Sequence, residues 1–463
     1  MDRTERRKID RQIIDILVPV IVENALMTLA SMILTGFVGR LPVSDISAYG
    51  LGNRIFNIYY AIFRGLTIGV MIIAAKAYGR GDLARCRRLQ QECYMAIMPL
   101  AVLVALLIIL IPQSFIGTMT ADPGLLATGG RYLRVIAFGF PAIAMTSLNA
   151  AAFQAQGNTR MPMITAGLGN LVNIGCGYAL VFGLGVLPAL GLTGAAVSQL
   201  LSQAVMCLFG LWLIYGRHGL YAGIGRGGRL TLPSGADVRQ LYATGVPAAL
   251  ENSFWNLATV IISRVILSYG QAYYAAYQLG LQAEGLCDMV STGFVTAAMT
   301  LAAIAIGRGD EYLYRRYFKR LMFQCLVITA AAMAVLAFGS SVLCGMLTDK
   351  PQLIAIALTY LHAMVWSQLP QNASKIYAGF IRSCHHEKMP MVINFVGVWL
   401  VRLPLVLVCG GWLKLDVVWL WWTFNLDQWC RLLIAAVFFK RHRVIDYLSD
   451  RSADGRKAAR TTA

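Results

Sequence analysis

The sequence contains twelve runs of mostly apolar residues, and these runs limit its possible folds more than any other feature. The hydrocarbon core of a bilayer is about 30 Å thick, so a helix needs about 20 apolar residues to cross it. Only 13% of the residues are charged and 58% are hydrophobic, whereas soluble domains carry about 25% charged residues. We therefore predict an all-α integral membrane protein. The predicted spans are 14–39, 48–77, 93–116, 132–153, 161–183, 190–215, 241–268, 273–305, 321–347, 353–381, 389–411 and 416–439.

The basic residues are distributed unevenly between the loops that join these spans. If both termini and the loops after even-numbered spans share one side, that side holds 28 of the 40 Lys and Arg residues, and the other holds 5. Loops rich in Lys and Arg face the cytoplasm. We therefore predict a plasma (inner) membrane protein with both termini cytoplasmic. The net charge of +18 then lies against anionic lipid headgroups, so we expect membrane lipid and not nucleic acid as a partner.

The second half of the sequence repeats the first with an offset of 228 residues. Pro-Val-Ile-Val-Glu-Asn at 19–24 aligns with Pro-Ala-Ala-Leu-Glu-Asn at 247–252, and Gly-Arg-Gly-Asp occurs at 79–82 and again at 307–310. Across residues 19–82 and 247–310, 19 of 64 positions are identical. Chance similarity between apolar helices would not keep Pro, Glu-Asn and Gly-Arg-Gly-Asp in one register. The sequence therefore indicates an internal duplication.

Each repeat contains six predicted spans, so both repeats enter the membrane in the same direction. Parallel repeats of this kind are related by an axis along the membrane normal. We predict twelve transmembrane helices in two pseudo-twofold-related six-helix lobes around a central cleft. The N-terminal lobe would comprise 1–222 and the C-terminal lobe 223–463, with a cytoplasmic connector at about 217–240. This plan suits alternating access, in which two lobes rock about a site near the midplane.

Several short motifs, taken in order, resemble the multidrug and toxic compound extrusion (MATE) transporters. Besides the Gly-Arg-Gly-Asp turn, they are Val-Gly-Arg-Leu at 38–41, Ala-Tyr-Gly-Leu-Gly at 48–52, Gln-Gly-Asn-Thr-Arg-Met-Pro at 156–162, Ala-Ala-Tyr-Gln at 275–278 and Ala-Gly-Phe-Ile-Arg at 378–382. The resemblance covers nearly the whole chain. It implies a fold of two six-helix lobes and an antiporter that exports amphiphilic, often cationic compounds against an inward flow of sodium ions or protons.

The chain departs from the family pattern at three positions where the resemblance implies carboxylates. These positions hold Leu34, Trp255 and Gln371, which are apolar or neutral. The coupling ion implied by the resemblance, H⁺ or Na⁺, therefore stays open. We expect no bound cofactor beyond that ion.

Glu23 and Glu251 lie near the middle of the first span of each repeat, four residues after a proline. A carboxylate at this depth costs several kcal/mol unless it is paired or protonated, so it faces the bundle interior or a wet cavity. We expect a proton or cation site at both positions, with Asn24 and Asn252 beside them as substrate contacts. The alternative is a structural carboxylate that hydrogen-bonds within its own lobe.

Glu284 and Asp288 are four residues apart in the eighth span, so they share one helix face. Two carboxylates this close in a medium of low dielectric constant resist simultaneous ionisation. Their repeat counterparts are Phe56 and Tyr60, so the pair is specific to the second repeat. We predict that they form the coupling site together with Glu251. The alternative is neutralisation by a basic residue from another helix.

Arg54 and Arg402 are cations deep in predicted spans, with no acid on the same helix to neutralise them. The repeat counterpart of Arg54 is Gln282, so this position is polar in both repeats. We expect these three residues to contact substrate, which would favour an anionic or zwitterionic compound. The alternative for the two arginines is a salt bridge to one of the buried acids.

The remaining intramembrane charges have simpler interpretations. Asp427 and Arg431 are four residues apart, so we expect them to neutralise each other. Lys375 lies close enough to a span end for its ammonium group to reach the interface. Cys-His-His-Glu at 384–387 occupies a loop whose counterpart in the first repeat is Gln-Gly-Asn-Thr, so we expect no metal there.

The secondary-active antiporter has three competitors. A flippase of a lipid-linked, anionic or zwitterionic substrate could share the two-lobe plan, and an arginine-rich cleft would favour it. A channel needs a repeated filter or charge ring, which the sequence lacks. A membrane enzyme needs clustered catalytic residues, and no ATP-binding Gly-x-x-x-x-Gly-Lys-Ser/Thr motif occurs. We therefore predict a non-enzymatic transporter of small molecules that works as a monomer.

Overall fold

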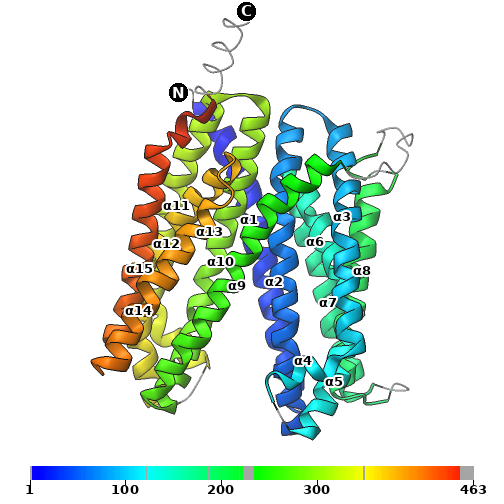
Figure 1. Ribbon diagram of the computed structural model, residues 1–463, viewed down its shortest axis with the longest axis vertical. Coiled ribbons are helices and arrows are strands. Elements are labelled where there is room, and N and C mark those ends of the chain that lie inside the picture. The colour runs from blue at the N-terminus through cyan, green and yellow to red at the C-terminus, as the bar shows by residue number, and fades with distance from the viewer. Residues whose placement is uncertain are drawn as a thin grey trace, which may run out of the picture. The chain divides into compact units, whose positions relative to one another are not determined.

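The computed structural model describes residues 3–120, 122–184, 188–217, 219–222, 234–347 and 350–448, and these form helices and no strand (Figure 1). The helices of the first repeat are α1 (Arg3–Val38), α2 (Val43–Gly79), α3 (Leu83–Leu110), α4 (Pro112–Gly117), α5 (Pro123–Ala137), α6 (Phe140–Ala155), α7 (Arg160–Phe182) and α8 (Leu192–Tyr215). Those of the second are α9 (Gly235–Ser268), α10 (Gln271–Arg308), α11 (Glu311–Leu347), α12 (Pro351–Ser383), α13 (Met389–Phe395), η1 (Val396–Arg402), α14 (Leu403–Val406), η2 (Leu407–Trp412), α15 (Val417–Arg441) and η3 (Val444–Asp446).

Nine helical segments within the described ranges are long and apolar enough to cross a membrane. The pair α5 and α6, bent by 43° at its break, makes a tenth. The helices α9 and α15 have comparable lengths but do not pass the same test of hydropathy and charge. The prediction of an all-α membrane fold is confirmed.

The Gly-Arg-Gly-Asp motif makes the same turn in both repeats. Gly81 and Gly309 have φ values of 79° and 68°, a left-handed conformation that glycine adopts without strain. The aspartates that follow, Asp82 and Asp310, each accept a hydrogen bond from the backbone N–H three residues later. Such N-caps stabilise the start of the next helix. The motif therefore ends one span and starts another at matching places.

A glycine–tyrosine contact recurs in the packing of both repeats. A Cβ on Gly52 would lie 2.5 Å from the ring of Tyr132, and one on Gly280 would lie 2.3 Å from the ring of Tyr360. Only glycine permits this approach, which brings α2 against α5 and α10 against α12. In Figure 1, α12 runs beside α10, α11 and α15 in the second half of the chain.

The chain forms two compact units whose limits differ from those of the repeats. One unit, here the C-terminal lobe, comprises Met1–Ile21 and Leu250–Ala463, and the other, the N-terminal lobe, comprises Val22–Ala249. The sequence-based boundary between residues 222 and 223 follows the duplication. The boundaries of the compact units instead fall within α1, after Ile21, and within α9, after Ala249. Residues 223–233 of the expected connector lie outside the described ranges.

The first half of α1 therefore packs with the second repeat. Leu17 lies against Gly293, where an added Cβ would be 2.7 Å from a Leu17 methyl group. The carboxylate of Asp10 accepts hydrogen bonds from Arg320 and from Gln324, the latter at 3.0 Å. These contacts join the N-terminal end of α1 to α10 and α11.

The first half of α9 packs in the corresponding way with the first repeat. Ala249 lies against Gly65, where an added Cβ would be 2.6 Å from the Ala249 backbone. Arg85 donates two hydrogen bonds to Asp237, at 2.8 and 2.9 Å. The first helix of each repeat is thus shared between the two compact units.

The eleventh predicted span contains two stretches of π-helix, η1 and η2, separated by α14. π-Turns inside helices are rare and occur often at functional sites. This segment carries Asn394 and Arg402 into the C-terminal lobe, where Arg402 is buried. The sequence pattern predicted an ordinary helix here.

Candidate functional site

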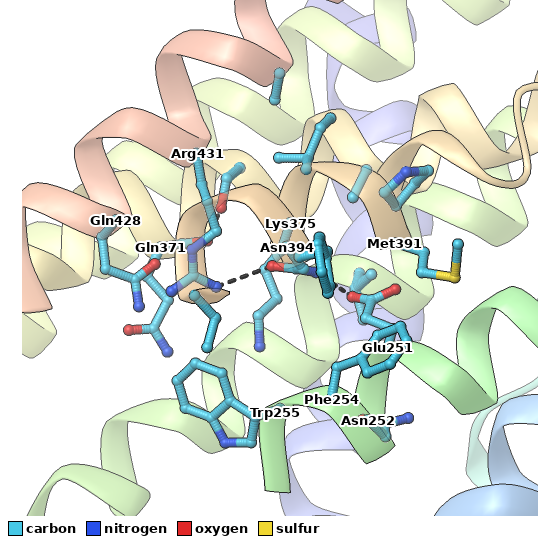
Figure 2. A pocket seen from close by; sticks show the side chains of 18 of the residues that line it. Glu251, Asn252, Phe254, Trp255, Gln371, Lys375, Met391, Asn394, Gln428 and Arg431 are labelled. Carbon is cyan, nitrogen blue, oxygen red and sulfur yellow. Dashed lines mark hydrogen bonds between the residues drawn. The ribbon is translucent and has the colours of Figure 1, made fainter. Parts of the chain in front are cut away.

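The C-terminal lobe encloses a cavity of about 250 Å³ bounded by α9, α10, α12, α13, η1 and α15. Its wall combines aromatic rings with charged and amide side chains (Figure 2). The polar lining residues are Glu251, Asn252, Asp288, Gln371, Ser374, Lys375, Arg382, Asn394, Gln428 and Arg431.

Glu251 is neutralised within its own lobe. Arg382 Nη2 donates to its Oε2 at 2.5 Å, and Asn394 donates to its Oε1. The Asn394 amide oxygen accepts from Arg431 Nη1 at 2.9 Å, so Asn394 links Glu251 to a second guanidinium (Figure 2). The sequence predicts that this span ends at residue 381, which would leave Arg382 in a cytoplasmic loop. The structure corrects this, because α12 continues to Ser383 and holds Arg382 only 4% exposed.

Asp427 is fully buried and is shared by two arginines. Arg431 Nη2 lies 2.5 Å from its Oδ2, and Arg402 Nη2 lies 2.8 Å from the same oxygen. The predicted pairing of Asp427 with Arg431 is confirmed. Of the two interpretations of Arg402, the structure shows the salt bridge. Its guanidinium also lies 4.8 Å from the ring centre of Trp255, a favourable cation–π distance.

The carboxylates of Glu284 and Asp288 have neutral partners. Tyr360 Oη donates to Glu284 at 2.5 Å, Gln368 Nε2 donates to it at 3.4 Å, and Gln371 Nε2 donates to Asp288. No Lys or Arg of the described residues forms an ion pair with either acid. In the structure, neither Arg54 nor Arg402 forms a salt bridge with Glu284 or Asp288, so this alternative interpretation of the two acids is not observed. Glu284 is buried and Asp288 is partly buried, and neither has an ion-pair partner among the described residues.

Lys375 was expected to reach the membrane interface, and the structure corrects this. Its side chain is half-buried and lines the cavity of the C-terminal lobe. Among the described residues its ammonium group has no hydrogen bond or ion pair. Hydropathy locates a residue along its helix but does not show which face of the helix it occupies, so the sequence could not place Lys375 in the interior.

Glu23 lies in the N-terminal lobe, where it lines a small cavity of about 60 Å³ with Tyr60, Asn149 and Gln203. One of its oxygens, Oε2, is buried and has no hydrogen-bond partner among the described residues. Glu23 and Glu251 thus occupy matching repeat positions but differ in their partners, because Glu251 has a guanidinium.

A second cavity of the N-terminal lobe, about 210 Å³, has no charged residue in its described lining. Asn173 Nδ2 donates to Gln199 Oε1 at 2.9 Å, and the Asn173 oxygen accepts from Ser198 at 3.1 Å. Leu34, at a position where the resemblance implies an acid, also lines this cavity. The remaining amide and aromatic lining residues are Tyr49, Asn53, Phe56, Asn57, Tyr60, Tyr132, Asn170 and Gln203. This cavity could not be predicted from the sequence, because isolated Asn and Gln residues follow no recognisable spacing.

Four of the five expected substrate contacts do not line the described cavities, and Arg402, which is paired with Asp427, is one of them. Arg54 and Gln282 are exposed on α2 and α10, and Asn24 is partly buried on α1. Asn252 lines the cavity of the C-terminal lobe. The roles of all five residues in substrate binding stay predictions.

Duplicated bundles of membrane-length helices, each enclosing polar cavities and buried ionisable groups, define a multi-pass membrane transporter. The MatE family model matches residues 19–179 and again 247–408, so the chain belongs to the MatE family of multidrug and toxic compound extrusion transporters. The two matched segments correspond to the two repeats.

Named relatives cover nearly the whole chain. A probable multidrug resistance protein NorM from Thermotoga maritima is 25% identical over 446 residues, covering 95% of this chain and 94% of the relative. The multidrug resistance protein PmpM of Pseudomonas aeruginosa is 21% identical, with 85% and 82% covered. These relatives support multidrug efflux transport as the general activity and a transporter instead of an enzyme.

Solved structures show the same fold. A MOP superfamily transporter from Pyrococcus furiosus aligns with a TM-score of 0.87 at 17% identity, covering 95% of this chain and 96% of the other. An outward-facing multidrug resistance MATE family transporter aligns with a TM-score of 0.86 at 16% identity, with 95% and 96% covered. The twelve-helix, two-lobe architecture predicted from the sequence is that of these transporters.

Proposed function

We propose that this protein is a proton-coupled antiporter that exports small amphiphilic organic compounds, including cationic ones, across the plasma membrane by alternating access. Both termini would lie in the cytoplasm, as the distribution of basic residues indicates. The observation that carries the proposal is the pair Glu284 and Asp288, two interior carboxylates with only neutral hydrogen-bond donors.

Burial makes an unpaired carboxylate costly as an anion, so such a group exchanges a proton when water reaches it. Glu284 is 9% exposed and lies four residues from Asp288, which lines the cavity. A sodium site would need oxygen acceptors turned toward the ion. Both oxygens of Glu284 instead face donor groups, which supports proton coupling.

Glu251 and Glu23 have different places in this proposal. Arg382 already balances the charge of Glu251, so Glu251 would hold the arginine network in place and not carry the proton. Glu23 has a buried oxygen without a hydrogen-bond partner in the described chain and is the second candidate for a coupling proton.

The uncharged cavity of the N-terminal lobe supports an amphiphilic cargo. The rings of Tyr49, Tyr60 and Tyr132 offer flat apolar faces, and amides such as Asn173 and Gln199 offer hydrogen bonds. An organic cation would be attracted there by the aromatic faces, since cation–π contacts contribute about 0.5–2 kcal/mol each.

Transport of a fluorescent organic cation, ethidium, into proteoliposomes under an imposed pH or sodium gradient tests this function. We expect the wild type to respond to the pH gradient, and the double variant Glu284→Gln, Asp288→Asn to lose that response. Asp122→Asn, which removes an exposed acid at the start of α5, is the matched control. Uptake driven by sodium alone, or an unchanged pH response in the double variant, would contradict proton coupling.

A flippase of a lipid-linked, anionic or zwitterionic substrate is the second candidate. The observation that favours it is the concentration of Arg382, Arg402, Arg431 and Lys375 in one lobe. Translocation of a fluorescent anionic lipid, without transport of ethidium in the same vesicles, would support this alternative.

A further inference from the structure

The cavity of the C-terminal lobe contains positive charge that the coupling mechanism does not use. Two guanidiniums, those of Arg402 and Arg431, share the single carboxylate of Asp427. Lys375 has no acceptor among the described residues, although it lines the cavity. The cavity thus presents two cationic groups, on α12 and α15, that are not matched one to one by carboxylates.

Both acids that line this cavity already accept hydrogen bonds from the protein. Glu251 receives hydrogen bonds from Arg382 and Asn394, and Asp288 receives one from Gln371. A positively charged ligand would have to displace these donors, whereas a negatively charged ligand would find the ammonium of Lys375 available.

The shape of the cavity adds a second requirement. Figure 2 shows the side chains of Lys375 and Arg431 pointing into the same space, which the rings of Trp255 and Phe254 close on another side. The Nε of Arg431 is buried and lacks a hydrogen-bond acceptor in the described chain. At about 250 Å³ the cavity is smaller than the roughly 300–1,000 Å³ typical of sites for drug-sized ligands.

We propose that this cavity binds a small organic anion, with its carboxylate on Lys375 and Arg431 and its apolar part against Trp255 and Phe254. Charge-assisted hydrogen bonds to a carboxylate are about twice as strong as neutral ones, and the low effective dielectric constant of a protein interior strengthens them further. The site is separate from the uncharged cavity proposed above for amphiphiles.

Equilibrium binding of radiolabelled benzoate to the purified full-length protein in detergent tests the inference. Excess unlabelled benzoate should displace the label, whereas benzamide and benzylamine, of similar shape but neutral and cationic, should not. We expect Lys375→Gln to weaken binding by about tenfold or more, equivalent to about 1.4 kcal/mol. Lys375→Arg should stay within about threefold of the wild type, because it keeps the charge.

Lys388→Gln is the matched control, because Lys388 is exposed at the start of α13 and does not line the cavity. Competition by benzamide equal to that of benzoate, stronger competition by benzylamine, or unchanged binding in Lys375→Gln would overturn the inference. The competition experiments with benzoate, benzamide and benzylamine use only the wild type. They therefore test whether the cavity prefers an anion even if a variant misfolds. No gradient is applied, so a failure of proton coupling would leave this result unaffected.

Discussion

The two lobes share a packing scheme but differ in the polarity of their interiors. Gly52 against Tyr132 and Gly280 against Tyr360 make the same close contact. One turn along the same helix, Phe56 in the N-terminal lobe corresponds to Glu284 in the C-terminal lobe. The glycine–tyrosine contacts therefore determine how closely the helices pack in both lobes. Other interior positions can then differ between the lobes, with an aromatic residue in one and an ionisable residue in the other.

The two lobes also differ in the partners of their buried polar side chains. Amides such as Asn173 and Gln199 satisfy one another without charge. In the C-terminal lobe, Arg402, Asp427 and Arg431 depend on each other, because a buried charge without its partner is costly. We expect the charged network to fail as a unit and the amide network to fail locally.

The largest effect is expected for Asp427→Asn. Two buried guanidiniums would lose their common counter-charge, and breaking a buried ion pair costs about 3–5 kcal/mol. The comparison in the other lobe is Asn173→Ala, which leaves Gln199 unpaired at a cost of about 1 kcal/mol. Thermal unfolding of the purified variants measures both losses of stability. An equal loss in Asp427→Asn and Asn173→Ala would contradict the proposed difference between the lobes.

A smaller effect is expected for Gly280→Ala and Gly52→Ala. Each adds a methyl group into a tyrosine ring, and overpacking costs about 1–3 kcal/mol. Stability should fall by similar amounts, but pH-driven ethidium transport should fall further in Gly280→Ala, because Tyr360 also donates to Glu284. Equal transport by the two variants at matched folded protein would argue against a role for that hydrogen bond.

The ion pairs at the shared first helices should contribute less. The side chains of Asp10 and Arg320 are 24% and 15% exposed, and those of Asp237 and Arg85 are 14% and 41% exposed. We expect Asp10→Asn and Asp237→Asn each to cost about 1 kcal/mol or less, because solvent screens partly exposed pairs. Added salt should reduce the difference in unfolding temperature between the wild type and each variant. A difference that does not depend on salt would contradict this account.

The smallest effect concerns pH and the loop after α12. Burial lowers the pKa of His386 from its ordinary value of 6.5, and repulsion from His442 and His385 lowers it further, while Glu387 acts in the opposite sense. The folded protein thus favours neutral His386, so its stability is retained above about pH 6.5 and declines as the pH falls below it. The unfolding temperature should drop between about pH 7.5 and pH 5.5.

His386→Gln should reduce that drop in unfolding temperature. The corresponding loop of the first repeat, residues 156–159, contains no histidine and serves as the reference. Replacing Asn158 with Gln should leave the pH dependence as it is in the wild type. An unchanged drop in His386→Gln would assign the effect to other groups.

The duplication, the membrane-spanning helices and the family could be predicted from the sequence, because they rest on composition, length and register. The pairing of Asp427 with Arg431 could also be predicted, since residues four apart on one helix are neighbours. These features are local or are repeated within the chain, so a single sequence contains them.

The partners of the buried acids could not be predicted. Arg382 binds Glu251 across 131 residues of sequence, and Tyr360 binds Glu284 across 76. Such contacts depend on how each helix is rotated about its axis, and hydropathy is almost the same on all faces of a helix in a membrane. The π-turns around Arg402 and the sharing of α1 and α9 between lobes likewise left no pattern in the sequence.

That sharing bears on how the chain is made and how it arose. A six-helix fragment ending before α9 would lack the arm, residues 235–249, that completes its own compact unit, and a separate second half would lack residues 3–21. Each half thus contributes part of its first helix to the other compact unit, as each protomer of a domain-swapped dimer lends an element to its partner. An ancestral single-repeat polypeptide with this architecture would have been an obligate partner of its own copy, and gene fusion would have made that mutual dependence permanent.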